Sequence, residues 1–120
     1  MGHLYKAGMW FKKKAKITGF NAASYNGTDY RTVPITTSSP IYNNSVASGK
    51  PSDITNYFYV PFLGRYVNGA INAIGSVGHY WTSNSNIWSN GQALDLHMDN
   101  NQTGIISYTR SNGVPLFYSE

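Results

Sequence analysis

Cysteine is absent from all 120 positions of this sequence. A chain without cysteine forms no disulfide and offers no thiolate to a metal. Charged side chains are also scarce, at 12% of the residues. No apolar run approaches the roughly 20 residues that span a membrane, and the first residues lack the apolar stretch of a signal peptide. We therefore expect no disulfide, no thiolate metal site and no membrane insertion.

The polarity of the chain comes instead from uncharged residues, chiefly Asn, Ser, Thr, Gly and Tyr. Ten Tyr, five Phe and three Trp supply more apolar surface than a disordered chain carries. The length allows one domain with one modest core. A neutral surface rich in hydrogen-bonding groups is typical of extracellular, virion or paratope-like proteins. We expect a single domain over residues 1–120 on the outside of a cell or virion.

The net charge of +4 is unevenly distributed. Lysines crowd the N-terminal part, while the remainder is close to neutral. Two interpretations stay open: a solvated strand or tail, or a surface that docks on an acidic partner or anionic polymer. No nucleic-acid-binding module surrounds these residues, so nucleic acid is not an expected partner. The lysines are Lys6, Lys12, Lys13, Lys14 and Lys16.

Secondary structure is expected to be mostly β, or α+β at most, because helical periodicity is almost absent. Gly, Asn, Ser, Thr and Pro interrupt the chain every few residues, and β-branched and aromatic runs lie between them. Ser52 or Asp53 could cap a helical turn over 52–57. Pro61 is expected to end a strand, and Gly104 is available for a left-handed position in a hairpin over 100–104. We expect one strand or two over 9–20, and single strands over 57–63, 79–83, 92–99, 105–109 and 114–118. An extended piece is expected over 31–35, and loops over most of 21–56 and over 84–91.

An ordered series of short motifs runs through the second half of the chain. Residues 58–66 read Phe-x-Val-Pro-x-x-Gly-x-Tyr, 68–69 read Asn-Gly, 75–83 read Gly-Ser-x-Gly-x-Tyr-Trp-x-Ser, 93–96 read Ala-x-x-Leu and 110–116 read Arg-x-Asn-Gly-x-Pro-Leu. The series resembles the C-terminal part of paralogous surface domains of Bacteroidetes and their phages. Those domains are similar to C-type-lectin-fold modules, including formylglycine-generating-enzyme-like domains and retroelement variable proteins. The resemblance covers about the C-terminal half, and residues 1–56 lack the family's usual Trp-Arg-x-Pro-Thr-like start.

The resemblance implies a C-type-lectin-like fold whose late loops, residues 82–91 and 99–112, form the ligand face. A tryptophan beside amides stacks on a sugar ring or anchors a protein partner. The alternative is that Trp88 tucks under its loop while the asparagines serve turn geometry. We expect Tyr80, Trp81, Leu94 and Leu96 in the core. The candidate ligand contacts are Asn84, Asn86, Trp88, Asn100, Asn101, Tyr108 and Arg110.

The abundance of Asn, Ser and Tyr between residues 84 and 112 has two explanations. Adenine-directed mutagenesis scatters these residue types over the ligand face of retroelement-diversified proteins, which the resemblance includes. Ordinary surface polarity produces the same composition.

The segment from Asp95 to Asn101 contains several possible metal ligands. Asp95 and His97 share one strand face, and Asp99 and Asn100 follow. Calcium needs several oxygen ligands, and the sequence has neither EF-hand spacing nor a calcium-lectin signature. We expect a polar strand face and hairpin here, with no metal and no cofactor.

Catalytic groups are few. The internal carboxylates are Asp29, Asp53, Asp95 and Asp99, no cysteine is present, and no nucleophile-elbow motif occurs. We expect no enzymatic activity.

Two functions therefore remain in view. The first is a surface-exposed binding module of the adhesin or phage receptor-binding type, which recognises a glycan or a protein. The second is a virion, fibre or fimbrial subunit that self-assembles. Loops as long as residues 21–56 are uncommon in a free domain, so we expect a homo-oligomer or larger assembly.

Overall fold

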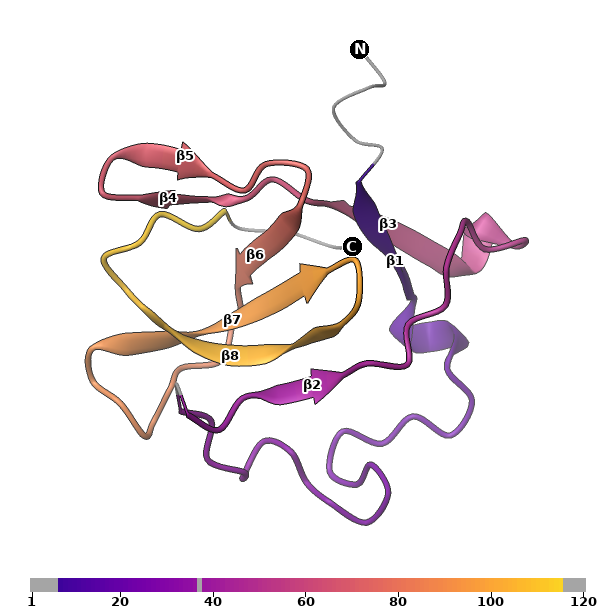
Figure 1. Cartoon of the computed structure of the whole chain (residues 1–120). Coiled ribbons are helices and arrows are strands. Elements are labelled where there is room, and N and C mark those ends of the chain that lie inside the picture. The colour runs from indigo at the N-terminus through magenta and orange to yellow at the C-terminus, as the bar shows by residue number, and fades with distance from the viewer. Residues whose placement is uncertain (1–6, 37, 116–120) are drawn as a thin grey trace.

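The computed structural model of this protein describes residues 7–36 and 38–115 and is mostly β, as the sequence predicts (Figure 1). All named strands pair antiparallel. Within the described residues, no helix is long and apolar enough to cross a membrane. The strands are β1 (Gly8–Lys12), β2 (Ile41–Asn43), β3 (Tyr57–Pro61), β4 (Arg65–Val67), β5 (Ala70–Asn72), β6 (Val77–Trp81), β7 (Gln92–Asp99) and β8 (Thr103–Thr109), with 3-10 turns η2 (Lys14–Lys16) and η3 (Ile54–Asn56).

The strands form one sheet and two ribbons. The four-stranded sheet has the order β2-β8-β7-β6, and β1-β3 and β4-β5 are separate two-stranded ribbons. β7 is the longest strand and pairs on both sides, so that Leu96 lies opposite Tyr80 of β6 and Ile105 of β8. In Figure 1 the β1-β3 ribbon crosses above one end of the sheet and the β4-β5 ribbon lies above the other. This central position makes β7 the organising element of the fold.

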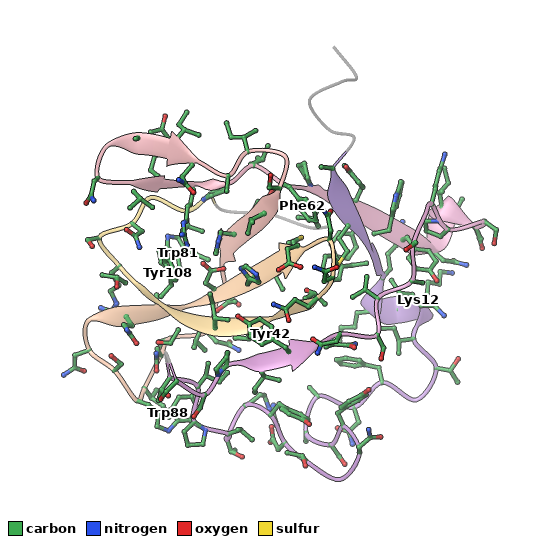
Figure 2. The ribbon with its side chains drawn as sticks, viewed as in Figure 1. Lys12, Tyr42, Phe62, Trp81, Trp88 and Tyr108 are labelled. Carbon is green, nitrogen blue, oxygen red and sulfur yellow. The ribbon has the colours of Figure 1, made fainter. Side chains whose placement is uncertain are left out.

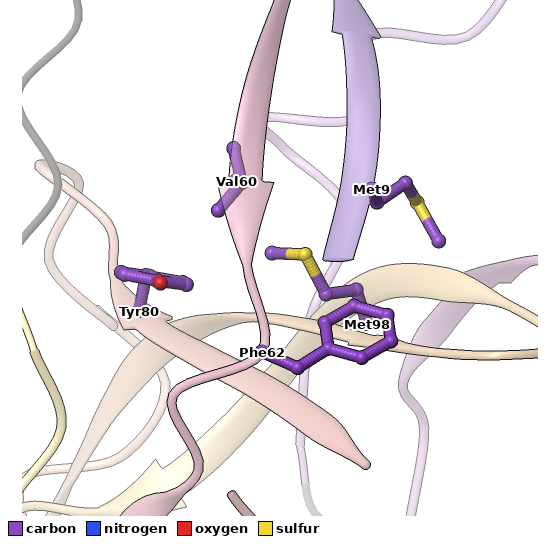
Figure 3. Close-up of a cluster of buried hydrophobic side chains, with 5 residues drawn as sticks. All are labelled: Met9, Val60, Phe62, Tyr80 and Met98. Carbon is purple, nitrogen blue, oxygen red and sulfur yellow. The ribbon is translucent and has the colours of Figure 1, made fainter. Parts of the chain in front are cut away.

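The main core lies between the β1-β3 ribbon and one face of the sheet (Figure 3). Val60 and Met98 are completely buried, and Phe62 is 2% exposed. Burying such a side chain stabilises the fold by about 1.5–3 kcal/mol. Gly78 faces this cluster, where an added Cβ would lie 2.7 Å from Met98 Cγ. The cluster members are Met9, Val60, Phe62, Tyr80 and Met98.

Alternation along β6 separates two aromatic residues that were both predicted in the core. Successive strand residues point to opposite faces, and Tyr80 is 3% exposed within the core cluster. Trp81 lies on the other face and is only half-buried, so its predicted place in this core is wrong. Leu94 is buried as predicted, and Leu96 is partly buried against the cluster.

The N-terminal half contains less regular structure than predicted. The strand expected over 9–20 ends at Lys12 and is followed by η2, because four lysines between 12 and 16 leave no apolar face to bury. Residues 31–35 form turns and bends instead of an extended piece. The predicted helical turn is confirmed as η3, where Asp53 Oδ1 accepts a hydrogen bond from the Thr55 N–H at 3.3 Å.

The C-terminal half follows the prediction more closely. β7 has the predicted bounds, the 84–91 loop is confirmed, and β3 ends at Pro61. The strand expected over 79–83 lies at Val77–Trp81. Gly104 is in β8 without a left-handed conformation, and an added Cβ there would collide with the backbone oxygen of Ile41. Residues 114 and 115 are not in a strand, and the rest of the strand predicted to 118 lies outside the described residues.

The sequence analysis missed the β4-β5 hairpin. Asn68 and Gly69 connect its strands with φ values of 49° and 77°. Positive φ at both positions is the requirement of a type I′ turn, for which Asn-Gly is the preferred pair. The signal was therefore present in the sequence as the Asn-Gly motif.

Candidate functional site

A groove of about 530 Å³ lies where the β6-β7 loop meets the N-terminal loop. Its walls come from two distant parts of the chain: residues 82–85, Ile87 and Trp88 from the β6-β7 loop, and Tyr30 and Arg31 from the N-terminal loop. Its floor is apolar and includes Ile35, Leu94 and Ile105. We call it the Trp88 groove. Two of the predicted contact residues, Asn84 and Trp88, line it together.

Trp88 is held in place by Asn86. The side chain of Asn86 is 5% exposed. Its Oδ1 accepts a hydrogen bond from the Trp88 backbone N–H at 3.0 Å, and its Nδ2 donates to Ser107 Oγ at 2.7 Å. Ser107 in turn donates to Gln92 Oε1 at 2.5 Å. Asn86, predicted as a ligand contact, is instead a buried anchor that ties the Trp88 loop to β8.

The opposite wall carries an oriented guanidinium. Arg31 donates from Nε and Nη2 to the two carboxylate oxygens of Asp29, at 2.9 and 2.8 Å. The Arg31 backbone N–H also donates to Asp29 Oδ1 at 3.0 Å. The hydrogen bond from the Arg31 side chain is the main reason that the pKa of Asp29 lies below its usual value. Of the five guanidinium N–H donors, three remain available to a ligand.

The groove therefore combines three kinds of surface. Trp88 is half-buried and Tyr30 is 41% exposed, so both rings are accessible. Asn84 is an exposed amide beside hydroxyl residues, and Arg31 supplies charged donors. A small number of polar groups around an apolar floor is the usual composition of a small-molecule site.

The other predicted contacts do not join this groove. Asn100 and Asn101 are exposed at the β7-β8 turn, about 20 Å from Leu94 at 3.4 Å per residue along β7. Arg110 is exposed, and its Nε donates to the backbone oxygen of Gln92 at 3.0 Å. Tyr108 is half-buried on the opposite sheet face from the core. The seven predicted residues thus lie at several places instead of forming one ligand face.

Tyr108 belongs to a buried polar cluster on that second face. The Arg65 guanidinium lies 4.8 Å from the centre of its ring, and the His79 ring lies 5.4 Å away. His79 Nδ1 donates to Asp95 Oδ2 at 2.8 Å, while Arg65 Nη1 approaches His79 Nε2 at 3.4 Å. Both ring nitrogens of His79 therefore have a partner within the protein.

The second histidine, His97, extends this cluster across β7. It lies directly opposite His79, with ring centres 4.8 Å apart, and its Nε2 is 3.2 Å from Asp99 Oδ2. Asp99 also accepts the backbone N–H groups of Asn101 and Gln102 at 2.8 and 3.1 Å. The segment from Asp95 to Asn101 is therefore a hydrogen-bonded strand face followed by a turn. In the described part of the chain, no three His, Asp or Glu side chains are grouped to hold a metal ion.

The two carboxylates of this cluster have opposite pKa shifts. Burial raises the pKa of Asp95, against the opposing effect of its hydrogen bond to His79. For Asp99, burial alone would raise the pKa, but the hydrogen bonds from the Asn101 N–H and from His97 outweigh it and the pKa is lowered. Burial therefore makes the charged form of Asp95, which is completely buried, less favourable than it is in water.

Sequence reasoning missed one wall of the Trp88 groove. Tyr30 and Arg31 lie in a segment expected to be only a loop or extended piece, and no motif links it to residue 88. Their proximity to residue 88 arises because the N-terminal loop runs along the β2 side of the sheet (Figure 1). Family models, curated proteins and solved structures were all compared with this chain, and none of them matches it.

Proposed function

We propose that this protein is a non-enzymatic, surface-exposed binding module that holds a carbohydrate in the Trp88 groove. The observation that carries the proposal is the pairing of the Trp88 loop with the Tyr30-Arg31 wall across an apolar floor. A sugar ring presents an apolar face to an aromatic side chain, while its hydroxyl groups need hydrogen-bond partners around the rim. The groove offers both.

The shape and volume of the groove favour a sugar over a folded protein. Its volume of about 530 Å³ lies within the 300–1,000 Å³ range of small-molecule sites. A stable protein interface buries about 800 Å² on each partner and needs a larger, flatter patch. Asn84 and Arg31 stand at the rim, where they would accept and donate to sugar hydroxyls.

The sequence resemblance to C-type-lectin-like surface domains supports the same proposal, and with it a location on a cell or virion surface. The lectin-like fold stays a prediction. The structure changes the proposed contact set: Asn84 and Trp88 remain, Asn86 becomes the anchor of Trp88, and Tyr30 and Arg31 are added.

The test is a glycan array followed by calorimetric titration of the sugars that bind. We expect Trp88→Ala and Arg31→Ala each to weaken binding about tenfold or more, since truncation of a central aromatic or arginine contact costs about 1–2 kcal/mol or more. Tyr66→Ala is the matched control, because Tyr66 is 51% exposed and does not line the groove. Sugar binding that is unchanged in Trp88→Ala contradicts the proposed site, and an array without any bound glycan contradicts the proposed ligand class.

Self-assembly remains a second candidate because of one specific observation. Among the described residues, eleven large hydrophobic side chains are exposed and seven hydrophobic residues are buried. Four exposed ones gather at the β4-β5 ribbon, where an apolar groove of about 380 Å³ is lined by Leu63, Tyr66, Ile71 and Ile74. Exposed apolar patches of this kind mark interfaces. Light scattering distinguishes the candidates, because Ile71→Lys with Ile74→Lys should convert an assembled form to monomer without altering sugar binding.

A further inference from the structure

Among the described residues, strand β1 pairs with β3 on one edge and with no strand on its other edge. Its register with β3 is antiparallel, and the hydrogen bonds Phe62 N–H to Ala7 O (2.9 Å) and Lys13 N–H to Asn56 O (2.9 Å) mark the positions that face β3. Positions facing the partner alternate along an antiparallel strand. The intervening residues Gly8, Trp10 and Lys12 therefore direct their backbone N–H and C=O groups away from β3, and within the described chain these groups have no backbone partner.

Strand β1 lines a groove with a volume of about 660 Å³. All five residues of β1 line it, and the segment 45–51 forms the facing wall. Thr103 and Asn100 close the side at the β7-β8 turn. Five residues of β1 extend about 17 Å at 3.3 Å per residue. The space is an elongated slot beside an open strand edge, which we call the β1 slot.

The surroundings of the β1 slot carry an excess of positive charge, with one carboxylate, Asp99, in the lining. Lys12 and Lys50 line its two walls. Three further lysines follow directly after β1, and all five are exposed. In residues 7–36 and 38–115, none of these five ammonium groups forms a salt bridge. The five residues are Lys12, Lys13, Lys14, Lys16 and Lys50.

We propose that β1 accepts an extended, acidic segment of a partner protein as an added strand in the β1 slot. Main-chain hydrogen bonds to Gly8, Trp10 and Lys12 would supply affinity, as in other cases of strand addition. The lysines would select acidic side chains and steer the segment to the edge. A second copy of this chain fits less well, because the net charge of +4 brings repulsion to a basic rim.

Figure 2 shows Trp88 and Lys12 at opposite sides of the molecule, so this surface is separate from the Trp88 groove. The proposal does not depend on the proposed carbohydrate site. A Trp88→Ala variant should bind an acidic strand as well as the unaltered protein does, and its result therefore distinguishes failure of one proposal from failure of the other.

The probe is a capped hexapeptide, Glu-Val-Glu-Val-Glu-Val, titrated into the isotopically labelled protein and followed by NMR. We expect slowed amide hydrogen exchange at Gly8, Trp10 and Lys12, with Met9 and Phe11 little changed because they already pair with β3. Exchange that stays unchanged at the three edge amides at saturating peptide overturns the proposal.

Two matched controls separate strand addition from simple charge attraction. A fully N-methylated peptide of the same sequence keeps the three carboxylates but has no N–H, and it should bind about a hundredfold more weakly if three main-chain hydrogen bonds are lost. Equal binding of both peptides would show attraction by charge alone and overturn the proposal. Lys12→Gln with Lys50→Gln should weaken the unmethylated peptide about tenfold, whereas Arg110→Gln, which lies outside the slot, should not.

Discussion

The N-terminal region, residues 7–56, and the C-terminal region, residues 57–115, are held together by different kinds of hydrogen bond. Side-chain bonds described for residues 21–56 join positions two or three apart, as between Asp29 and Arg31 or Asp53 and Thr55. The C-terminal region has local bonds of the same kind, but six further side-chain bonds there join positions 14 to 21 apart, as between His79 and Asp95 or Asn86 and Ser107. Local bonds order a turn without attaching it to the sheet.

This difference has a functional consequence. Segments with few buried contacts open at low free-energy cost, whereas core strands open only with the whole fold. Both proposed surfaces combine a wall that is tied to the sheet or core with a wall from an N-terminal loop. The Trp88 groove has the anchored Trp88 loop and the Tyr30-Arg31 loop. The β1 slot has strand β1, whose Met9 is in the core, and the segment 45–51. A ligand would therefore meet one rigid wall and one adaptable wall.

Replacing one phenylalanine in each region should give the largest difference in the free energy of unfolding. Phe62→Ala removes a side chain that is 2% exposed and should lower the free energy of unfolding by about 3–5 kcal/mol. Phe20→Ala removes one that is 47% exposed beside Lys14, and should cost less than about 1 kcal/mol. Urea denaturation measures both. Similar losses for the two variants would contradict the division into a core-bearing and a loosely held region.

A second pair of variants tests the backbone of each region. Gly64 and Gly27 both have positive φ, 65° and 82°, so alanine is strained at either position by about 1–2 kcal/mol. At Gly64 the added Cβ would also collide with the backbone oxygen of Asn72, whereas nothing lies within 4 Å at Gly27. We expect Gly64→Ala to lower the melting temperature clearly more than Gly27→Ala. An equal decrease would mean that the β4-β5 hairpin can move away at no cost.

The smallest expected effects concern pH, and here the two regions should respond with opposite sign. The pKa of Asp95 is raised by burial, so the folded state binds its proton more tightly. The stability of the unaltered protein relative to Asp95→Asn should therefore increase as the pH falls through the raised pKa, and level off below about 3.8.

For Asp29 the sign is reversed, because hydrogen bonding to Arg31 lowers its pKa. Its contribution is present above about 3.8 and is lost as the pH falls through the lowered value. The effect should be small, since the pair is exposed to solvent, and 1 M salt should reduce it further while leaving the Asp95 effect in place. Denaturation series from pH 2 to 6 for Asp95→Asn and Asp29→Asn check both signs. A shared sign would contradict the contrast between a buried and an exposed carboxylate.

The predictable parts of the molecule are those in which a local pattern and the tertiary structure agree. In β7, Leu94, Leu96 and Met98 alternate with polar residues. Its bounds were predicted correctly because such alternation indicates a strand with one buried face. Ser52 and Asp53 were both predicted as possible caps from local sequence, and the structure shows that Asp53 is the one. Trp81 was misplaced because alternation tells which residues share a face and not which face meets the core.

The candidate site was half predictable. Trp88 and Asn84 stand in an obvious polar loop, and they do lie together in a groove. Arg31 and Tyr30 carry no local signal, because their role depends on where a long loop passes in space. Asn86 was assigned to the ligand on the basis of its loop position, and only the hydrogen bond to Ser107 reveals it as an anchor.

The sequence by itself determined the class of this protein: a small, cysteine-free, mostly β domain with a basic N-terminal part and an aromatic, amide-rich surface. Amino-acid composition and the periodicity of apolar residues suffice for this, because both can be assessed in each short segment without knowing the rest of the fold. The tertiary structure alone decided that Trp88 and Arg31 line one groove, that His79 completes the cluster around Asp95, and that β1 pairs only with β3 among the described residues. Each of these depends on a contact between residues far apart in the chain, and such contacts are set by the packing of the whole fold.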